Sequence, residues 1–355
     1  MKKSVLFVLP TAGGGGAERV TISLLRQLDP VRYDLSLLLL SREGQYLSSL
    51  PRHVRVLDLG GVRARFAFLP LVRTIRRERP EVVFSTHDYI NILCLAASFF
   101  VGSNVAFYAR HPIMPHASAS RDGTSTFHKY LLRLLYPRAR RVIAQTHAMR
   151  DTMVQVFGLP KEKLEVLINP VDTELIDSKI DGAPNPFDPA CVNFVAAGRL
   201  VPQKGFDVLL DAFRIVHARE PTARLHILGD GEERPKLERQ IENSGLSQVV
   251  LLPGFQDNPY PYFKYADLYV LPSRFEGLPN TVLESLYLGT PCVVTRCIPF
   301  MEEIIREPDN GAVVDVEDVE TLANKLLNRN GYRMAPALLE RSGTLDVDTL
   351  FSDQK

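Results

Sequence analysis

Two glutamates eight positions apart, Glu276 and Glu284, stand in the segment LPSRFEGLPNTVLESLYLGTPCVVT at 271–295. The first lies in a polar loop after an apolar run, and the second lies on the helix predicted to follow. Backbone N–H groups at a helix start attract anions, so a pair of carboxylates there is unusual. A ligand with hydroxyls for the carboxylates and a phosphate for the N–H groups would explain it, as a nucleotide sugar does. The alternative is a solvated acidic pair with a favourable dipole contact.

The turn between these glutamates carries residues with defined backbone roles. Gly277 permits a tight turn, Pro279 fixes one dihedral, and Asn280 is predicted to be the helix N-cap. These residues therefore open a helix whose N–H groups can meet the same ligand as the two acids.

Arg199 and Lys204 lie in the short loop GRLVPQKG at 198–205, after a predicted strand. Two cations on one loop can hold a diphosphate and stabilise the negative charge that develops as it leaves. Ordinary surface cations are the alternative. A further turn contains Gly229 and Gly231 and is interpreted as structural, shaping the wall that would bind a base.

Four glycines, Gly13–Gly16, join the first strand to its helix. Glycine lets backbone approach a phosphate or sugar closely. The loop is not the dinucleotide fingerprint, because the third glycine position falls on Glu18 or Arg19, and no Gly-Lys-Ser/Thr follows as in a P-loop. A ligand near Gly14, Gly15 and Gly16 is favoured over a plain turn.

Two histidines also follow predicted strands. His87 lies in STHD and His111 in ARHP, beside Arg110. An imidazole at a strand end can bind a sugar hydroxyl or a reacting oxygen, although a loop histidine is often only a polar residue. His111 ranks above His87.

Strands and helices alternate along the whole chain, which predicts parallel sheets covered on both faces. The expected strands are 5–9, 34–40, 54–57, 82–85, 105–109, 141–144, 164–168, 192–197, 224–228, 249–252, 268–271, 292–294 and 311–314. Three prolines at 181–189 indicate a linker. We predict two Rossmann-like doubly wound domains, at 1–180 and 191–340, a linker at 181–190, and a tail at 341–355 that can pack back on the first domain. Ligands are expected in a cleft at the strand C-terminal ends.

Composition sets limits on the class of protein. A chain of 355 residues with 45% apolar and 23% charged residues suits two soluble domains. The apolar run before Pro10 is too short for a signal or a membrane span. Four cysteines without metal-ligand spacing indicate reduced thiols in the cytoplasm, buried for Cys94, Cys191 and Cys292.

The net charge of +1 hides an asymmetry between the halves. Residues 1–180 carry 25 Lys and Arg against 15 Asp and Glu, and the remaining residues carry 17 against 26. Basic and apolar residues alternate at 63–79 and 133–141. A membrane surface suits this mixture better than nucleic acid does, and an arginine-rich solvated face is the alternative.

Taken together, these segments resemble the glycosyltransferase family 4 group of retaining sugar transferases. The resemblance spans nearly the whole chain, through the GGGGAER loop, NPVD at 169–172, the Arg199/Lys204 loop, LGDGEE at 228–233 and FEGLPNTVLES at 275–285. It implies a GT-B fold with the active site between two domains, retention of configuration and no metal or other cofactor. The triplet Asp346-Val-Asp348 is interpreted as surface.

The resemblance also implies residue roles. Arg199 and Lys204 would hold the donor diphosphate, Glu276 the donor sugar and Glu284 the ribose hydroxyls. The N–H groups of Gly277 and Leu278 would face the phosphate. Gly14–Gly16 would border donor and acceptor, and His111 would lie near the reacting sugar, with Arg110 and His87 on the acceptor side.

The sequence therefore predicts a cytoplasmic enzyme, peripheral on the inner membrane. It would move a hexose or N-acetylhexosamine from a nucleotide diphosphate, preferably UDP, to a glycan acceptor linked to polyprenyl diphosphate. The alternatives are a nucleotide-sugar epimerase or hydrolase of the same fold, and a non-catalytic nucleotide-sugar binder.

Overall fold

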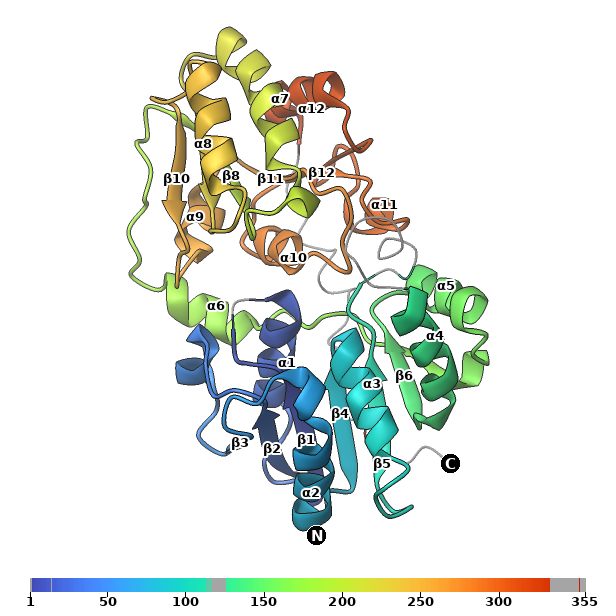
Figure 1. The fold of residues 1–355 in the computed structure, drawn as a ribbon. Helices are drawn as coiled ribbons and strands as arrows, with labels where there is room; N and C mark the ends of the chain where they lie inside the picture. Colours follow the sequence, from blue (N-terminus) through green and yellow to red (C-terminus); the bar gives the residue numbers. More distant parts are fainter. Residues whose placement is uncertain (1, 14, 114, 116–125, 333–350, 352–355) are drawn as a thin grey trace. The chain divides into compact units, whose positions relative to one another are not determined.

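The computed structural model describes residues 2–13, 15–113, 115, 126–332 and 351 (Figure 1). It divides into two compact units. The first contains the described residues up to 170 together with Phe351, and the second contains those from 171 to 332. The boundary therefore lies ahead of the proline-rich segment 181–189, which contains neither helix nor strand.

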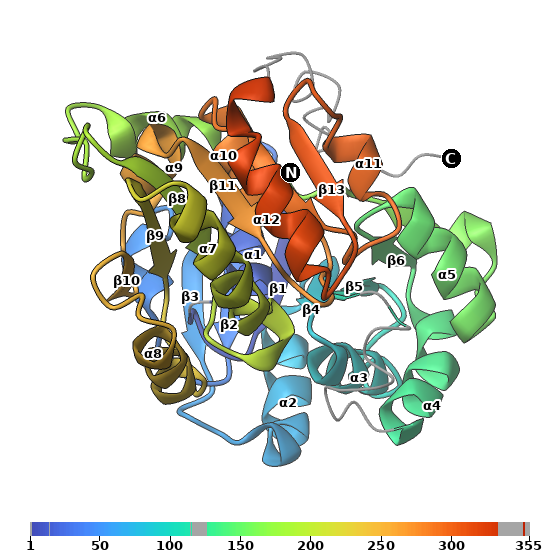
Figure 2. The ribbon, with the colours of Figure 1, turned by 90° about the horizontal axis from the view of Figure 1, so that it is seen from above.

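The first unit is built on a parallel sheet of seven strands in the order β3-β2-β1-β4-β5-β6-β7. The strands are β1 (Lys3–Leu9), β2 (Tyr33–Leu39), β3 (Arg55–Asp58), β4 (Val82–Thr86), β5 (Ala106–Arg110), β6 (Arg141–Ala144) and β7 (Leu164–Val166). Its helices are α1 (Gly16–Gln27), α2 (Phe68–Glu78), α3 (Asp88–Ala97), α4 (Thr126–Leu135) and α5 (His147–Phe157). Helices α2, α3 and α4 lie side by side along one face of this sheet (Figures 1 and 2).

The second unit repeats the plan with six parallel strands in the order β10-β9-β8-β11-β12-β13. They are β8 (Val192–Ala197), β9 (Ala223–Leu228), β10 (Val250–Gly254), β11 (Leu268–Leu271), β12 (Cys292–Thr295) and β13 (Gly311–Val314). The helices are α6 (Thr173–Ile180), α7 (Phe206–Arg219), α8 (Arg234–Asn243), α9 (Tyr260–Tyr265), α10 (Asn280–Tyr287), α11 (Met301–Ile304) and α12 (Val319–Leu327).

The thirteen strands of the described residues lie within two residues of the predicted bounds, whereas two helices there, α6 and α11, fall where the sequence analysis expected none. Helix α6 has a recognisable start, because the Asp172 side chain accepts a hydrogen bond from Leu175 N at 3.0 Å as its N-cap. Helix α11 has only four residues, too few to show a helical period. Asn280 was also wrongly predicted as an N-cap: Pro279 occupies that position, and Asn280 is the first helical residue.

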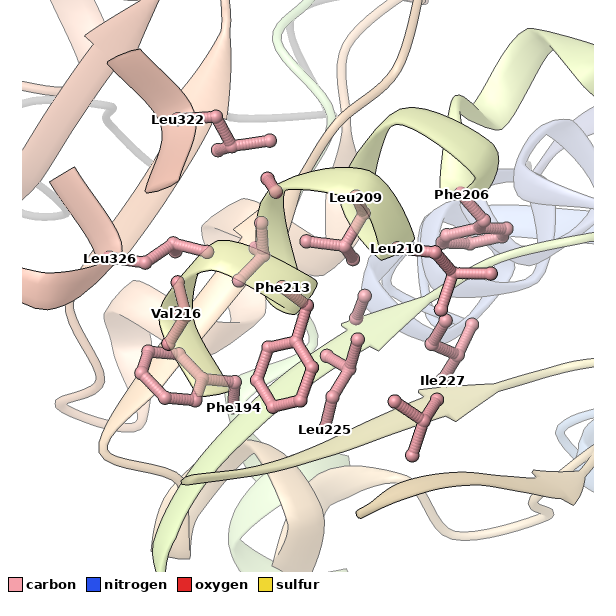
Figure 3. Packing of buried hydrophobic residues seen from close by; sticks show 14 of the residues in the cluster. Phe194, Phe206, Leu209, Leu210, Phe213, Val216, Leu225, Ile227, Leu322 and Leu326 are labelled. Carbon is pink, nitrogen blue, oxygen red and sulfur yellow. The ribbon is translucent and has the colours of Figure 1, made fainter. Parts of the chain in front are cut away.

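The core of the second unit lies between α7 and its sheet (Figure 3). Phe206, Leu209, Leu210, Phe213 and Val216 recur at helical spacing, so they form one apolar face. That face packs against buried side chains of β8 and β9, among them Phe194, Leu225 and Ile227, while Leu322 and Leu326 of α12 join the cluster. Each such fully buried side chain contributes about 1.5–3 kcal/mol relative to an exposed one.

The core of the first unit includes one residue from the far end of the chain. Phe351 is buried among aromatic side chains of four strands, with ring centroids 6.2 Å from Phe7, 6.0 Å from Tyr33, 6.0 Å from Phe84 and 5.5 Å from Tyr108. Its carbonyl accepts a hydrogen bond from Lys3 Nζ at 2.7 Å. The triplet 346–348 lies outside the described residues.

The four cysteines are free thiols. Cys94 and Cys292 are buried as expected, whereas Cys191, at the start of the second sheet, is only half-buried. Burial raises the pKa of the Cys94 thiol to about 12.

Candidate functional site

Each sheet has one position at which the strand order reverses, and this is where open α/β sheets bind ligands. In the second unit it lies between the neighbours β8 and β11. The connections that leave these two strands contain Lys204 and Glu276. Lys204 Nζ lies 2.5 Å from Glu276 Oε1, and Ser273 Oγ donates to the same carboxylate oxygen at 2.8 Å. The structure thus brings two predicted site residues, 72 positions apart, into direct contact.

Close backbone contact between the two connections permits this pair. Gly205 has φ +64°, and a Cβ there would lie 2.1 Å from the carbonyl oxygen of Pro272. The aliphatic part of Lys204 packs over Gly198, where a Cβ would lie 3.1 Å from Cε. Gly205 is therefore required so that the lysine loop can lie against the glutamate loop, and Gly198 leaves room for the lysine side chain.

Arg274 ties the same loops together, a role that sequence reasoning missed. Its guanidinium donates to both carboxylate oxygens of Asp207 at 2.9 Å and to Glu317 at 2.5 Å. The hydrogen bonds to Asp207 raise the pKa of Arg274, so the cation is permanent. Nearby, Gln203 Nε2 donates to the Phe275 carbonyl at 2.9 Å. Hydrogen bonds on both sides therefore hold the loops that carry Lys204 and Glu276 in place.

Arg199 differs from Lys204 although both lie on one loop. Its side chain is exposed, and within the described parts of the chain it makes no hydrogen bond or ion pair. Gly229 and Gly231 pack against the backbone of this loop, where Cβ atoms would lie 2.0 Å from Gly198 O and 2.4 Å from Leu200 O. Arg199 is thus a free cation on a supported loop.

Helix α10 completes this site. Glu284 is buried on its second turn, and Gly277 and Leu278 are buried in the loop that precedes it. Tyr269 of β11 donates to Thr281 Oγ1 at 2.7 Å, which fixes the start of the helix to the sheet. A cation, a carboxylate and a helix N-terminus therefore lie together, which suits a ligand with a phosphate and hydroxyls.

The first unit has its own reversal point, between β1 and β4. Gly15 is the N-cap of α1, which begins at Gly16, and Glu18 lies in the first turn. His87 joins β4 to α3 with φ +74°, and its Nε2 lies 3.0 Å from Glu18 Oε1. Gly14 lies outside the described residues.

Gly15 is constrained by this pair. A Cβ at that position would lie 2.1 Å from Glu18 Oε2, so any other residue would displace the carboxylate. The sequence attributed the glycine run to a ligand. The structure shows that one of these glycines accommodates an acid of the protein itself.

His111 lies close by and is buried. Its Nδ1 is 2.7 Å from the hydroxyl of Tyr136 and 3.2 Å from Asp88 Oδ1. Burial alone would raise the pKa of Asp88, but the charge and hydrogen bond of His111 hold it below its usual value. Sequence reasoning missed Asp88 and Tyr136, because nothing in their local pattern marks a tertiary contact.

Arg110 is also fully buried, one residue before His111. It donates to Asn169 Oδ1 and, at 3.5 Å, to Thr86 Oγ1. Burial lowers the pKa of this guanidinium to about 10. Arg110 therefore links the ends of β4 and β5 to the chain segment that leads toward the second unit.

The described residues contain no group of three or more His, Cys, Asp or Glu side chains placed to hold a metal ion. None of their helices has the length and apolar character needed to cross a membrane.

Both units match known family models. Residues 14–175 match the model described as Glycosyltransferase Family 4, and residues 186–328 match the model described as glycosyl transferases group 1. The chain belongs to the family 4 glycosyltransferases. The family resemblance seen in the sequence is thereby confirmed.

Proteins similar to this chain are named as glycosyltransferases. An uncharacterised glycosyltransferase of Methanocaldococcus jannaschii is 30% identical over 246 residues, which is 66% of this chain and 60% of that protein. The N-acetylgalactosamine-N,N'-diacetylbacillosaminyl-diphospho-undecaprenol 4-alpha-N-acetylgalactosaminyltransferase of Campylobacter jejuni is 27% identical over 334 residues, covering 91% of this chain and 88% of the enzyme.

A solved structure establishes the fold. Anabaena HepE, crystallised with UDP and glucose, superposes with a TM-score of 0.78 at 20% identity, over 98% of this chain and 97% of HepE. The predicted GT-B fold of this family 4 glycosyltransferase is confirmed.

Proposed function

We propose that this glycosyltransferase moves a hexose or N-acetylhexosamine from a UDP-sugar to a glycan acceptor linked to polyprenyl diphosphate, with retention and without a metal. The reaction would serve the assembly of a bacterial surface polysaccharide or related glycan. The contact between Lys204 and Glu276 at the reversal point of the second sheet carries the proposal.

The second unit is the proposed donor half. A diphosphate would lie against Lys204 and Arg199, with the N–H groups of Gly277 and Leu278 at its other side. Lys204 is already paired with Glu276, so the carboxylate orients the ammonium and accepts the sugar hydroxyls beside it. Glu284 would bind the ribose hydroxyls from α10, and Asn280 lies at the start of the same helix. The UDP and glucose named for HepE support this donor class.

Metal independence follows from the charges available in this half. The leaving diphosphate develops negative charge that a divalent cation or fixed protein cations can stabilise. Lys204 and Arg199 provide two positive charges on one supported loop. We expect EDTA to leave the rate unchanged, and a rate that requires added Mg²⁺ or Mn²⁺ would refute this part.

The first unit is the proposed acceptor half. The Campylobacter relative acts, by its name, on a diphospho-undecaprenol-linked sugar and forms an α linkage. Sugars of the common UDP-hexoses are α-linked to the diphosphate, so an α product here would mean retention. We place Gly15, Gly16, Arg110 and His87 on the acceptor side, as well as Gly14, and we place His111 next to the reacting sugar.

Purified enzyme with a polyprenyl-diphosphate-linked acceptor tests the proposal. UDP-hexoses and UDP-N-acetylhexosamines are each supplied, with GDP-sugars for comparison, and the product is examined by NMR. We expect one UDP-sugar to give an α-linked product. Incubation of that donor without acceptor should leave its sugar unchanged, whereas formation of an epimer would establish the isomerase alternative.

We also propose that the first unit contacts the membrane through a basic-aromatic face. This face consists of the exposed apolar residues Phe66, Leu69, Phe99, Phe100, Phe127, Tyr130 and Leu134 with the exposed cations Arg63, Arg65, Arg73, Arg76, Arg77, Arg79, Arg133, Arg138 and Arg140. Its elements are α2, the end of α3, and α4, which lie side by side (Figure 2).

The cations and rings of this face are interleaved. The Arg138 guanidinium lies 4.5 Å from the Phe99 ring centroid, and Arg65 lies 4.9 Å from that of Phe66. Phe68 of α2 meets Phe100 edge to face at 5.5 Å. Aromatic rings enter the interface while arginines meet lipid phosphates, each cation contributing about 1 kcal/mol near an anionic surface.

Vesicle sedimentation tests this contact. We expect the protein to bind vesicles containing phosphatidylglycerol and not vesicles of phosphatidylcholine alone. Phe66→Ser with Leu69→Ser should release it, whereas Leu251→Ser with Phe255→Ser, exposed apolar residues of the second unit, should not. Equal binding by both double variants would refute the assignment of the face.

A further inference from the structure

Glu18, His87 and Tyr89 meet at the reversal point of the first sheet, and the proposed function leaves Glu18 and Tyr89 without a role. Glu18 comes from the helix after β1, and the other two come from the junction of β4 and α3. This is the position equivalent to that of Lys204 and Glu276 in the second unit. Parallel sheets of this kind expose the carboxyl ends of both strands to ligands there.

The contact between Glu18 and His87 sets the chemistry of the imidazole. A carboxylate can only accept a hydrogen bond, so the proton shared across the 3.0 Å contact belongs to Nε2 of His87. The other ring nitrogen, Nδ1, is then the one left for a ligand. In the described parts of the chain Nδ1 has no hydrogen-bond partner, and the side chain is 24% exposed. His87 thus offers an oriented, partly exposed ring.

The backbone at His87 is held in an uncommon conformation. Its φ of +74° lies in a region that favours glycine, so a non-glycine residue there is strained. The conformation lets His87 serve as N-cap of α3 while its ring contacts Glu18, and Asn91 N donates to its carbonyl at 2.8 Å. Strain of this kind persists where the surrounding structure fixes it.

Tyr89 adds an exposed aromatic surface beside the pair. Its ring centroid lies 6.0 Å from that of His87, and the residue is 37% exposed. Burial and the charge of Glu18 raise the pKa of Tyr89 to about 12, so its phenol stays protonated. A rigid ring with one apolar face and a polar tip packs well on the C–H face of a sugar.

We infer that Glu18, His87 and Tyr89 form the subsite for the terminal sugar of the acceptor, in which the His87 imidazole hydrogen-bonds a sugar hydroxyl through Nδ1. The Tyr89 ring packs on the pyranose, and Glu18 is a positioning residue that fixes the orientation of the imidazole. This inference rests on the proposed function, because a transferase needs a sugar hydroxyl bound in its acceptor half.

The test separates acceptor binding from donor binding. The variants are Glu18→Gln, His87→Asn and Tyr89→Leu, with Tyr89→Phe as the conservative rescue. Asparagine tolerates positive φ, so His87→Asn retains the backbone. His53→Asn, at an exposed histidine of the same unit, is the matched control. Each protein is assayed for transfer to a soluble short-chain acceptor and for its rise in Tm with UDP.

We expect Glu18→Gln, His87→Asn and Tyr89→Leu each to lower kcat/KM for the acceptor at least tenfold, and the loss in Tyr89→Leu should appear mainly as a higher KM. Tyr89→Phe should recover most of what Tyr89→Leu loses, because it keeps the ring, and His53→Asn should behave as wild type. All variants should keep the wild-type rise in Tm with UDP.

Two outcomes overturn the inference. An unchanged acceptor kcat/KM in His87→Asn and Tyr89→Leu would show that the subsite does not hold the acceptor. Loss of the UDP response in the same variants would assign them to donor binding or to folding. If instead wild-type enzyme transfers no sugar to any acceptor, the proposed function itself has failed, and the two failures are therefore distinguishable.

Discussion

The two units place a charged pair at the same position of the same topology, yet with different chemistry. In the second unit the first connection supplies Lys204 and the other supplies Glu276, at 2.5 Å. In the first unit the first connection supplies Glu18 and the other supplies His87, at 3.0 Å. A lysine ammonium suits a leaving diphosphate, whereas an imidazole oriented by a carboxylate suits a sugar hydroxyl. The fold repeats, and the side chains assign each half a different ligand.

The cores differ as well. The second unit's core is built from its own segments, such as α7 and α12. The first unit's core takes in Phe351 from the opposite end of the chain. One half therefore depends on a distant residue for its packing.

The largest effect we expect is on this packing. Phe351→Ala should lower the free energy of unfolding of the first unit by about 3–5 kcal/mol, because it empties a site between four aromatic rings. Urea unfolding with and without UDP measures it. Phe255→Ala, at an exposed phenylalanine of the second unit, is the control. An equal, small effect of both changes would mean that the two cores do not differ in this way.

The second-largest effect we expect is the loss of catalytic rate in Lys204→Met. Removing a fixed cation from the leaving group lowers kcat about 10²–10³-fold, or about 2.7–4 kcal/mol. Initial-rate kinetics with a saturating acceptor measures the loss. Lys236→Met is the control, because Lys236 pairs with Glu233 on the exposed surface of α8, where such pairs matter little. The same rate loss in both variants would remove Lys204 from the donor site.

Gly205→Ala should destabilise the second unit by more than the strain of its positive φ alone. The new methyl group would lie 2.1 Å from Pro272 O and separate the Lys204 and Glu276 loops. Gly60 also has a positive φ, of +76°, but has open space around it. Gly60→Ala therefore measures the backbone strain of positive φ alone, about 1 kcal/mol. The difference in Tm between the two variants gives the cost of separating the loops. No difference would show that the loops adjust freely.

The smallest effect we expect is on how the stability of the second unit changes with pH. Burial lowers the pKa of His226 to about 4, from an ordinary value of 6.5. The unfolded chain therefore binds the proton first, so this residue's contribution to stability is complete above pH 6.5 and falls as the pH drops toward 4. His226→Asn should show a smaller fall in Tm between pH 7 and pH 5. An identical fall in wild type and variant would contradict the assignment.

Much of the fold could be predicted because it follows from local pattern. Continuous apolar runs separated by amphipathic helices gave every strand, and the prolines and glycines between them gave most boundaries. Helix α11 was too short for periodicity. The N-cap at Pro279 differed by one residue from the prediction, since cap position depends on the turn geometry that precedes it.

The candidate site was only partly predictable. Lys204, Glu276 and Glu284 could be named because residue type and position after a strand point to chemistry. Arg274 gave no such signal, although it binds Asp207 67 positions away. The role of Gly15 beside Glu18 likewise depends on a side chain's direction.

By itself the sequence determined the alternation of strands and helices, the family, and the residue types available at the strand ends, because hydrophobic period and turn chemistry are local properties. Only the tertiary structure decided which of those residues meet. Strand order places β1 beside β4 and β8 beside β11, so it alone brings Glu18 to His87 and Lys204 to Glu276. Contacts across many positions of the chain arise from packing, and no spacing along the chain encodes them.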